Sequence, residues 1–375
     1  MVPLARKTLI HEWRRFLPAA LAVGFACLLQ LLQAALVMGI FGSASVYVTG
    51  STAMLWAGYP GTQSVNIGRP IRLEVESRLR MDPDVQQVEP FYWLDADWNG
   101  TRGSASVFVS GINPRDHGIL FAKVLPVEAR RLLDAPDAVI IDRADVDKLG
   151  VGVGDAATIN GHRVRVVALA QGLRALGGVN VLSSVATARY LDPDAGVSNG
   201  PAYLVASTRP GVDPSKVAAR LNGAKGYGPY EVWTADSFAR RSERYWLFET
   251  GAGAGVLFLA IIVFAAGAAI SSQALMGAVA GSIREYATLN ALGVGLGALR
   301  WVVLEQALWV GIAGLLGAAA FGGLLLAIAR SQDVPVELDA AVTTVCMVVA
   351  LGVAVISGLA AVQSLRRADP ATLLR

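Results

Sequence analysis

The sequence predicts an α-helical membrane protein with four transmembrane helices, one before and three after a large mixed α+β extracytoplasmic domain. Four stretches contain no Asp, Glu, Lys or Arg: 16–68, 250–283, 306–329 and 340–365. Because a hydrocarbon core about 30 Å thick is crossed by ~20 helical residues, each stretch is long enough to span it. Their spacing is uneven. Charged residues recur throughout 69–249, which predicts a water-soluble domain between the first and second spans.

The first span is placed at 17–42, because the sequence after Gly42 turns to Ser, Thr, Gly and Tyr. A cleavable signal peptide is the alternative, with Arg14-Arg15 as its basic region. The apolar stretch is longer than the ~7–15 residues of an ordinary signal peptide, which favours an uncleaved anchor. Residues 4–17 carry apolar side chains at helical spacing, which predicts that the segment 1–16 is an amphipathic helix at the membrane surface.

Charge placement predicts the orientation of the spans. Nine basic residues flank them on one side, whereas the short loop 331–339 carries three acidic residues. Basic short loops stay in the cytoplasm, so both termini are expected there and the large domain on the opposite side. The predicted segments are a cytoplasmic amphipathic helix at 1–16, transmembrane helix 1 at 17–42, an extracytoplasmic domain at 43–248, transmembrane helix 2 at 249–276, a cytoplasmic coupling segment at 277–300, transmembrane helix 3 at 301–330, a short outer loop at 331–339, transmembrane helix 4 at 340–365 and a cytoplasmic tail at 366–375.

The composition excludes several functions. Between residues 44 and 248 there are 22 basic and 21 acidic residues, so the soluble domain offers no basic surface to nucleic acid. The two cysteines, Cys27 and Cys346, lie in predicted spans and the three histidines are far apart, so neither a metal nor another cofactor is expected. No Gly-Lys dipeptide occurs, which excludes a P-loop. The chain is therefore predicted to be non-catalytic.

Strands are predicted where apolar residues alternate or form short runs. Residues 138–141 are typical of a buried strand, and 104–109 of a second one. Residues 158–159 and 163–167 predict a hairpin, because Asn160-Gly161 between them supports the positive φ values of a type I′ turn.

Helices are predicted at 71–79 and at 214–221, the latter capped by Asp213. Residues 234–249 predict a further helix, which Thr234 would cap and which would run directly into the second span.

No pattern in the soluble domain predicts catalysis. Asp95 and Asp97 are explained by alternation on one face of a strand. Residues 150–154 have the glycine spacing of a phosphate-binding loop, but no helix follows them, so we expect a turn.

Several motifs together carry a resemblance to a known family. They are Arg284–Gly293 (REYATLNALG), Leu304-Glu305-Gln306, the C-terminal Arg366–Arg375 and, in the soluble domain, Leu149–Val167. With the one-plus-three order of spans, the chain resembles the FtsX/MacB-type permeases of ABC transporters, and its soluble domain their MacB-like periplasmic core. Tyr245-Trp246-Leu247 and Gln273-Ala274-Leu275 are most similar to the DevC branch.

The resemblance implies that the segment between spans two and three docks into a groove of a separate ATPase. Apolar side chains would fill the groove, while charged ones fix the register. A solvated connecting loop is the alternative, but such a loop has no need of large apolar residues. The residues implied in coupling are Arg284, Glu285, Tyr286, Ala287, Leu289, Leu292 and Gly293.

Glycines in the spans predict close helix packing. Two readings stay open, since they could form a dimer seam or pack spans two to four within one chain. Glu305, near the end of span three, is either functional or paired with Arg300. The packing glycines are Gly251, Gly255, Gly277, Gly281, Gly311, Gly314 and Gly317.

The resemblance implies a permease subunit of an ABC exporter in a bacterial inner membrane. ATP hydrolysis on an ABC ATPase subunit would drive extracytoplasmic export of a lipid, glycolipid, peptide or small hydrophobic molecule by mechanotransmission. Implied partners are a second copy of the chain, a periplasmic membrane-fusion adaptor and an outer-membrane duct. The alternatives are a non-transporting FtsX-like subunit that passes force to a cell-wall hydrolase, a lipoprotein-releasing permease, and a receptor without an ATPase.

Overall fold

The computed structural model describes residues 11–192, 200–223, 229–281, 288, 294–332 and 334–367. The chain divides into two compact units. One, here named the helical unit, comprises Met1–Gly39 and Gly255–Arg375, and the other, the head domain, comprises Ile40–Ala254.

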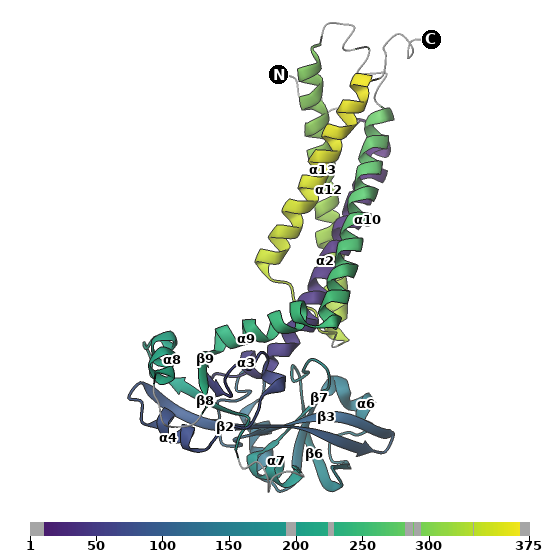
Figure 1. Ribbon diagram of the computed structural model, residues 1–375. Helices are drawn as coiled ribbons and strands as arrows, with labels where there is room; N and C mark the ends of the chain where they lie inside the picture. The colour runs from purple at the N-terminus through teal and green to yellow at the C-terminus, as the bar shows by residue number, and fades with distance from the viewer. Residues whose placement is uncertain are drawn as a thin grey trace. The chain divides into compact units, whose positions relative to one another are not determined.

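The helical unit consists of long apolar helices (Figure 1). They are α2 (Trp13–Gly42), α10 (Gly251–Gly281), α12 (Leu296–Ser331) and α13 (Ala340–Arg367). Among the described residues, three stretches are long and apolar enough to cross a membrane: Trp13–Thr49, Gly251–Gly281 and Trp301–Ser331. With the 28-residue α13, they form the predicted arrangement of one span before and three after the soluble domain. The helix α10 continues past the predicted span end at 276.

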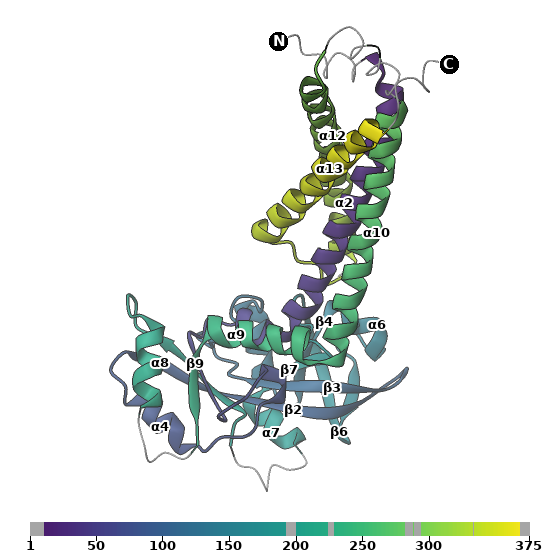
Figure 2. The same ribbon diagram turned by 45° about the horizontal axis from the view of Figure 1, so that its top comes forward.

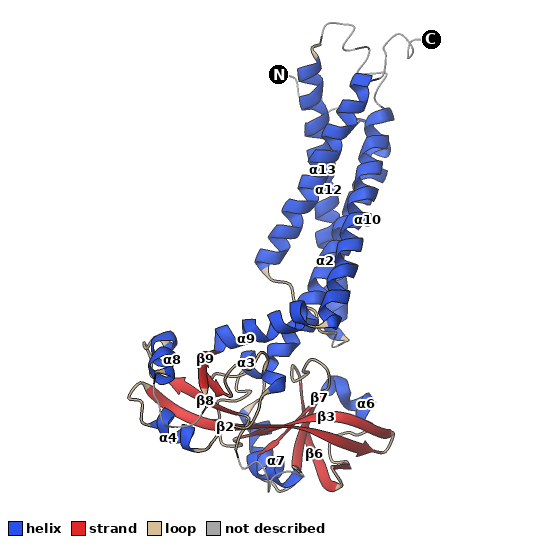
Figure 3. Ribbon diagram, viewed as in Figure 1, coloured by secondary structure: helices blue, strands red, loops and turns tan. Residues whose placement is uncertain are grey.

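All strands of the described residues belong to the head domain (Figure 3). Their order is β3-β7-β4-β6-β5-β2-β8-β1-β9, and β2 also pairs with β3. That extra pairing closes six strands into a small barrel, and the long β2 continues into a four-stranded sheet with β8, β1 and β9. The strands are β1 (Leu55–Gly58), β2 (Val85–Gly100), β3 (Gly103–Ile112), β4 (Ala138–Asp142), β5 (Ala156–Ile159), β6 (His162–Ala170), β7 (Val179–Ser184), β8 (Tyr203–Thr208) and β9 (Glu231–Thr234).

Alternate residues of all six barrel strands form one buried cluster. Because side chains alternate across a strand, this set defines the interior face of the barrel. The interior is filled by side chains, with Ala188 and Leu191 of α7 (Val185–Leu191) packed into the same cluster. The strand members are Ala96, Trp98, Val107, Val109, Val139, Ile141, Ala157, Ile159, Val164, Val166, Val179 and Val181.

The four-stranded sheet is covered on both faces by helices (Figure 2). On one face, α4 (Glu74–Arg80) and α8 (Pro214–Asn222) pack against Leu55 and Ala57 of β1. On the other, α3 (Val46–Thr49) and α9 (Ala235–Arg244) join the cluster of Trp56, which alternates with those residues along the strand. The short helices α5 (Val127–Arg131) and α6 (Val146–Leu149) precede β4 and β5.

Most of the local predictions for this domain are confirmed. Asn160 and Gly161 have φ values of 50° and 81° and join β5 to β6. Asp213 caps α8 and Thr234 caps α9 through side-chain oxygens. The prediction that 234–249 runs directly into the second span is wrong, because α9 passes into a π-helical turn and the chain is then extended at Thr250 (φ −110°, ψ 151°).

Candidate functional site

The chain passes between the head domain and the apolar helices at two places, residues 43–52 and 235–250. We name these two segments together the junction. The first contains a 3₁₀ turn (Ser43–Ser45) and α3, and the second contains α9 and the π-helical turn Tyr245–Glu249. Both segments belong to the head domain.

An aromatic cluster anchors both segments in the core of the head domain. Tyr47 of α3 and Phe238 of α9 are completely buried. The Phe238 ring stacks on Trp233 at 4.7 Å and lies 5.9 Å from Trp56. The Tyr47 ring lies 5.7 Å from Phe91. Aromatic pairs at these distances stabilise beyond the area they bury, so the segments are core elements and not linkers.

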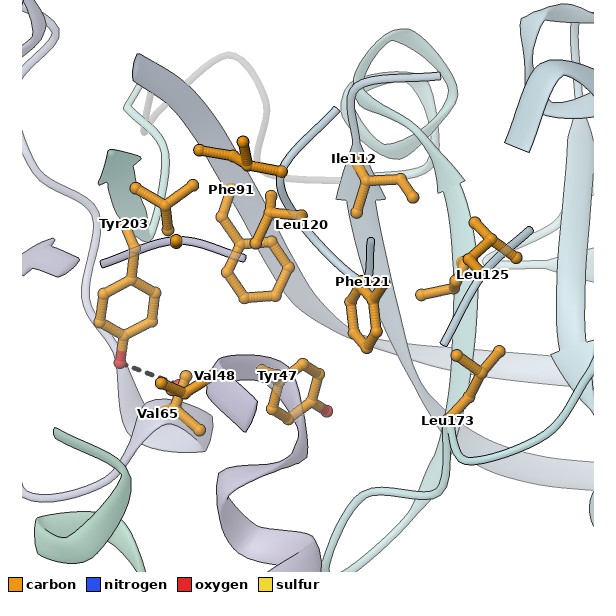
Figure 4. Close-up of a cluster of buried hydrophobic side chains, with 14 of the residues drawn as sticks. Tyr47, Val48, Val65, Phe91, Ile112, Leu120, Phe121, Leu125, Leu173 and Tyr203 are labelled. Atoms are coloured by element: carbon orange, nitrogen blue, oxygen red, sulfur yellow. Dashed lines mark hydrogen bonds between the residues drawn. The ribbon is translucent and has the colours of Figure 1, made fainter. Parts of the chain in front are cut away.

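Figure 4 shows part of this cluster, with Tyr47 and Val48 of α3 beside Phe91 and Phe121. The hydroxyl of Tyr203 donates to the carbonyl oxygen of Val65 at 2.9 Å, which satisfies the one polar group of that buried ring. The 3₁₀ turn at Val65 is thereby fixed to β8, next to both segments of the junction.

Hydrogen bonds tie the two segments to each other and to that turn. The Ser45 hydroxyl lies 2.7 Å from Glu243 Oε1 and 2.9 Å from the Gly42 carbonyl oxygen, and can donate to either. Ser242 Oγ accepts from the backbone N–H of Val65 at 3.1 Å. Trp246 Nε1 donates to Ser64 Oγ at 3.0 Å. Ser45 and Ser242 are fully buried, where an unmade hydrogen bond is costly.

The loop 113–125 holds the first segment from a third direction. Ser51 Oγ accepts from the Phe121 backbone N–H at 2.9 Å, and the Thr52 N–H donates to the Ile119 carbonyl at 2.9 Å. The backbone N–H of Lys123 donates to the Gly50 carbonyl at 3.0 Å. The end of the first segment, residues 50–52, is therefore bonded to this loop.

A buried charged pair of side chains shapes that loop. Glu89 accepts from the Ile119 backbone N–H and from Asn113 Nδ2, each at 3.0 Å. Arg130 donates to the carbonyl oxygens of Asn113 (2.8 Å) and Leu120. Burial lowers the pKa of Arg130, and the nearby Glu89 carboxylate opposes that shift. Glu89 also accepts from Gln87 Nε2 of its own strand at 2.6 Å, and the remaining hydrogen bonds of these two side chains hold the loop.

Thr250 and Gly253 form the corner at which the second segment ends. Thr250 Oγ1 lies 2.5 Å from the Trp246 carbonyl oxygen and accepts from the Gly253 N–H at 3.1 Å. The Thr250 hydroxyl thus caps both the end of the π-helical turn Tyr245–Glu249 and the start of α10. A Cβ at position 253 would overlap the carbonyl oxygens of Leu247 and Trp246, so only glycine fits.

The contacts of the junction connect its two segments mechanically to the head domain. Within the described residues, no group of three or more His, Cys, Asp or Glu side chains is placed to hold a metal ion. Asp95 and Asp97 lie exposed on one face of β2, as strand alternation predicts, and partial desolvation raises the pKa of Asp95. Residues 150–154 form a turn that starts from Gly150 in the left-handed conformation (φ 67°).

The seven residues predicted to couple to an ATPase, Arg284 to Gly293, lie outside the described residues. Of the packing glycines, Gly314 meets α2, Gly311 faces Ala354 of α13, and Gly281 faces the side chain of Arg15. Four others have no described neighbour where a Cβ would lie. These four are Gly251, Gly255, Gly277 and Gly317.

The sequence reading missed two glycines in the helical unit. Gly24 and Gly314 face each other, so that a Cβ on Gly24 would lie 3.0 Å from the Gly314 carbonyl oxygen. Gly267 of α10 faces Ala26, with its Cβ position 3.3 Å from the Ala26 Cβ. Neither glycine belongs to a Gly-xxx-Gly pair, but Ala20 precedes Gly24 and Ser271 follows Gly267 at small-xxx-small spacing, and that was the available signal.

The fold defines a class of protein: a membrane protein with one apolar span, a large soluble domain and three further apolar helices. A family model of the MacB-like periplasmic core domain matches residues 19–224, and one of the FtsX-like permease C-terminal region matches 254–370. The chain belongs to the FtsX/MacB-type permease family of ABC transporters, whose members work with ABC ATPase partners.

Two solved structures resemble the head domain. The periplasmic region of MacB from Actinobacillus actinomycetemcomitans is 14% identical, with a TM-score of 0.36, over 52% of this chain and 94% of that one. The extracellular domain of the noncanonic ABC-type transporter YknZ from Gram-positive bacteria is 16% identical, with a TM-score of 0.35, over 48% of this chain and all of that one. A comparison with curated proteins gives no match. The resemblance to the DevC branch stays a prediction.

Proposed function

We propose that the chain is the transmembrane subunit of an ABC exporter in a bacterial inner membrane, with both termini cytoplasmic and the head domain in the periplasm. ATP hydrolysis on a separate subunit would move the helices, and the head domain would use that movement to export a lipid, glycolipid, peptide or small hydrophobic molecule. A second copy of the chain, a periplasmic adaptor and an outer-membrane duct complete the proposed assembly.

The junction carries this proposal. A flexible linker would absorb a movement of the helices, whereas an element packed in a dense core transmits it, because protein interiors deform little. Tyr47 and Phe238 lie in one aromatic cluster, and Ser45 and Glu243 join the two segments directly. A displacement of either helix end therefore has to displace the head domain with it.

The coupling segment supplies the other half of the proposal. Residues 284–293 combine Arg284 and Glu285 with Tyr286, Leu289 and Leu292, which suits an apolar groove with a charged rim. Since the chain contains no P-loop sequence, nucleotide hydrolysis belongs to the partner that provides the groove.

Affinity purification of the full-length chain from its native membrane, with partners identified by mass spectrometry, tests the proposal. We expect an ABC ATPase at a stoichiometric level, and ATP hydrolysis by the complex but not by the chain alone. An adaptor among the partners would support export, and a cell-wall hydrolase in its place would support the non-transporting alternative. Hydrolysis of ATP by the purified chain unaided would refute the assignment.

A further inference from the structure

The face of α9 that points away from the core has an unusual composition. Its buried side is made by Phe238, Ala239 and Ser242. Its exposed side presents Arg240 and Arg244 one helical turn apart. Phe248, one further turn along in the π-helical segment, is 63% exposed. Two cations and a large apolar ring thus share one side of the same short segment, and the exposed Asp236 of the first turn of α9 precedes them at the same spacing.

Both arginines lack a partner within the described residues, where no hydrogen bond, ion pair or ring contact involves either side chain. The neighbouring Arg241 differs, since its guanidinium lies 3.8 Å from Glu231 and 5.5 Å from the centre of the Trp233 ring. Like charges four residues apart destabilise a helix. The dipole of α9 stabilises a cation in the last turn of the helix, at Arg244. Arg240 lies one turn earlier, where the effect of the dipole is weaker. An anion between the two would relieve the repulsion.

The position of α9 next to the apolar helix α10 in the chain suggests which anion this is. The apolar helix α10 begins at Gly251, three residues after Phe248. Only the π-helical turn Tyr245–Glu249 and Thr250 separate Arg244 from the start of α10. Lipid headgroups occupy a layer roughly 5–7 Å deep on each side of the hydrocarbon core. Because Thr250 is extended, α9 and α10 are two separate helices and not one continuous helix.

We propose that the exposed face of α9 binds the headgroup phosphate of an anionic phospholipid at the membrane surface. Arg240 and Arg244 pair with the phosphate oxygens, for which the guanidinium fork is well suited. Phe248 enters the boundary between headgroups and acyl chains, where aromatic side chains of membrane proteins collect. The proposal needs α10 to span the membrane and does not depend on coupling to an ATPase.

Native mass spectrometry of the full-length chain in a neutral detergent, titrated with phosphatidylglycerol, tests this binding. The parent chain should bind phosphatidylglycerol more tightly than phosphatidylcholine. The double variant Arg240→Gln/Arg244→Gln should lose roughly 30-fold in affinity for phosphatidylglycerol, because a basic residue near an anionic membrane surface contributes about fivefold. Phe248→Ser should weaken the binding of both lipids, since it removes an apolar contact common to them.

The matched control is Arg163→Gln/Arg165→Gln on the exposed face of β6, which removes the same charge far along the chain from any span. It should leave lipid binding unchanged, and thermal melting should show that all variants are folded. Equal affinity of the Arg240/Arg244 variant and the parent would overturn the proposal, as would an equal loss in the control. Displacement of phosphatidylglycerol by equimolar inorganic phosphate would point to a free anion instead. Unchanged lipid binding with loss of a co-purifying protein would assign the face to an acidic protein partner.

Discussion

Single residues fix the loops that hold the junction, and Arg130 is the clearest case. It is 1% exposed and donates to two carbonyl oxygens of the loop 113–125, close to the buried Glu89. A buried charge is tolerated only where its hydrogen bonds are made, so the loop and the arginine depend on each other. The adjacent Arg131 also reaches this loop, through Asp116, but both side chains lie at the surface, where an ion pair contributes little to stability.

Arg130→Met is therefore expected to destabilise the head domain by about 3 kcal/mol, because it leaves Glu89 buried without a nearby cation and two carbonyls without donors. For a domain of this size that corresponds to a fall of roughly 6–12 °C in melting temperature, measured on the full-length chain by near-ultraviolet circular dichroism. Arg131→Met is the control and should melt with the parent. Equal melting of both variants would show that the buried arginine does not support the loop.

The ion pair of Asp82 and Arg220 gives a pH-dependent prediction. Arg220 donates to both Asp82 oxygens, at 2.8 and 2.6 Å, and this lowers the pKa of the carboxyl. Since the folded pKa lies below the unfolded value of about 3.9, the stabilisation is complete above that pH and is lost as the pH falls through the folded pKa. The melting temperatures of the parent and Asp82→Asn should differ at neutral pH and converge in acid. A difference that stays constant down to pH 2 would contradict this.

At the scale of elements, the helical unit depends on close contacts of α2 with its neighbours. Gly24 and Gly314 bring the backbones of α2 and α12 together, and the Glu337 N–H donates to the Ala35 carbonyl at 3.1 Å. In a membrane, where apolar surface gains nothing by leaving lipid, such contacts come from small residues.

Gly314→Leu should force α12 away from α2, since a Cβ there would lie 2.9 Å from the Ala20 carbonyl oxygen. Gly317→Leu is the matched control on the same helix, because no described atom lies within 4 Å of its Cβ position. We expect the first variant to lower the melting temperature of the detergent-solubilised monomer, and the second to leave it unchanged. Equal effects would mean that the crossing of α2 and α12 is not the sensitive contact.

Local elements of the fold could be predicted from the sequence, and distant contacts could not. The hairpin at Asn160-Gly161 and the cap at Asp213 depend on neighbours two or three residues away, so their residue types suffice. The barrel needs β3 to pair in parallel with β7, which no local pattern encodes. The same holds for the junction. A serine next to a helix is typical of a cap, and a glutamate within a helix is typical of a solvated face. Neither residue type therefore predicts that the Ser45 hydroxyl lies 2.7 Å from Glu243 Oε1, a contact that only the fold creates.

At the scale of the whole molecule, the movement that ATP hydrolysis on the partner subunit causes has to reach the head domain through the polypeptide of this chain. The coupling segment is the entry point in this account. Leu289→Asp/Leu292→Asp should abolish co-purification of the ATPase, because charges would have to enter an apolar groove. The control is protease accessibility of the head domain, which should be unchanged if the variant inserts normally. Continued co-purification of the ATPase would place the docking surface elsewhere.

The most direct test of force transmission is hydrogen–deuterium exchange on the purified complex with its ATPase, with and without a non-hydrolysable ATP analogue. The account predicts that nucleotide binding changes the exchange of backbone amides in both segments of the junction, 43–52 and 235–250. In the variant Ser45→Val/Glu243→Ala, which removes the direct bond between the two segments and leaves Tyr47 and Phe238 in the core, the change in the head domain should be smaller than in the parent, although the ATPase still binds nucleotide. If the parent complex shows no nucleotide-dependent change anywhere in the head domain, the head is not driven through these segments and the central claim fails.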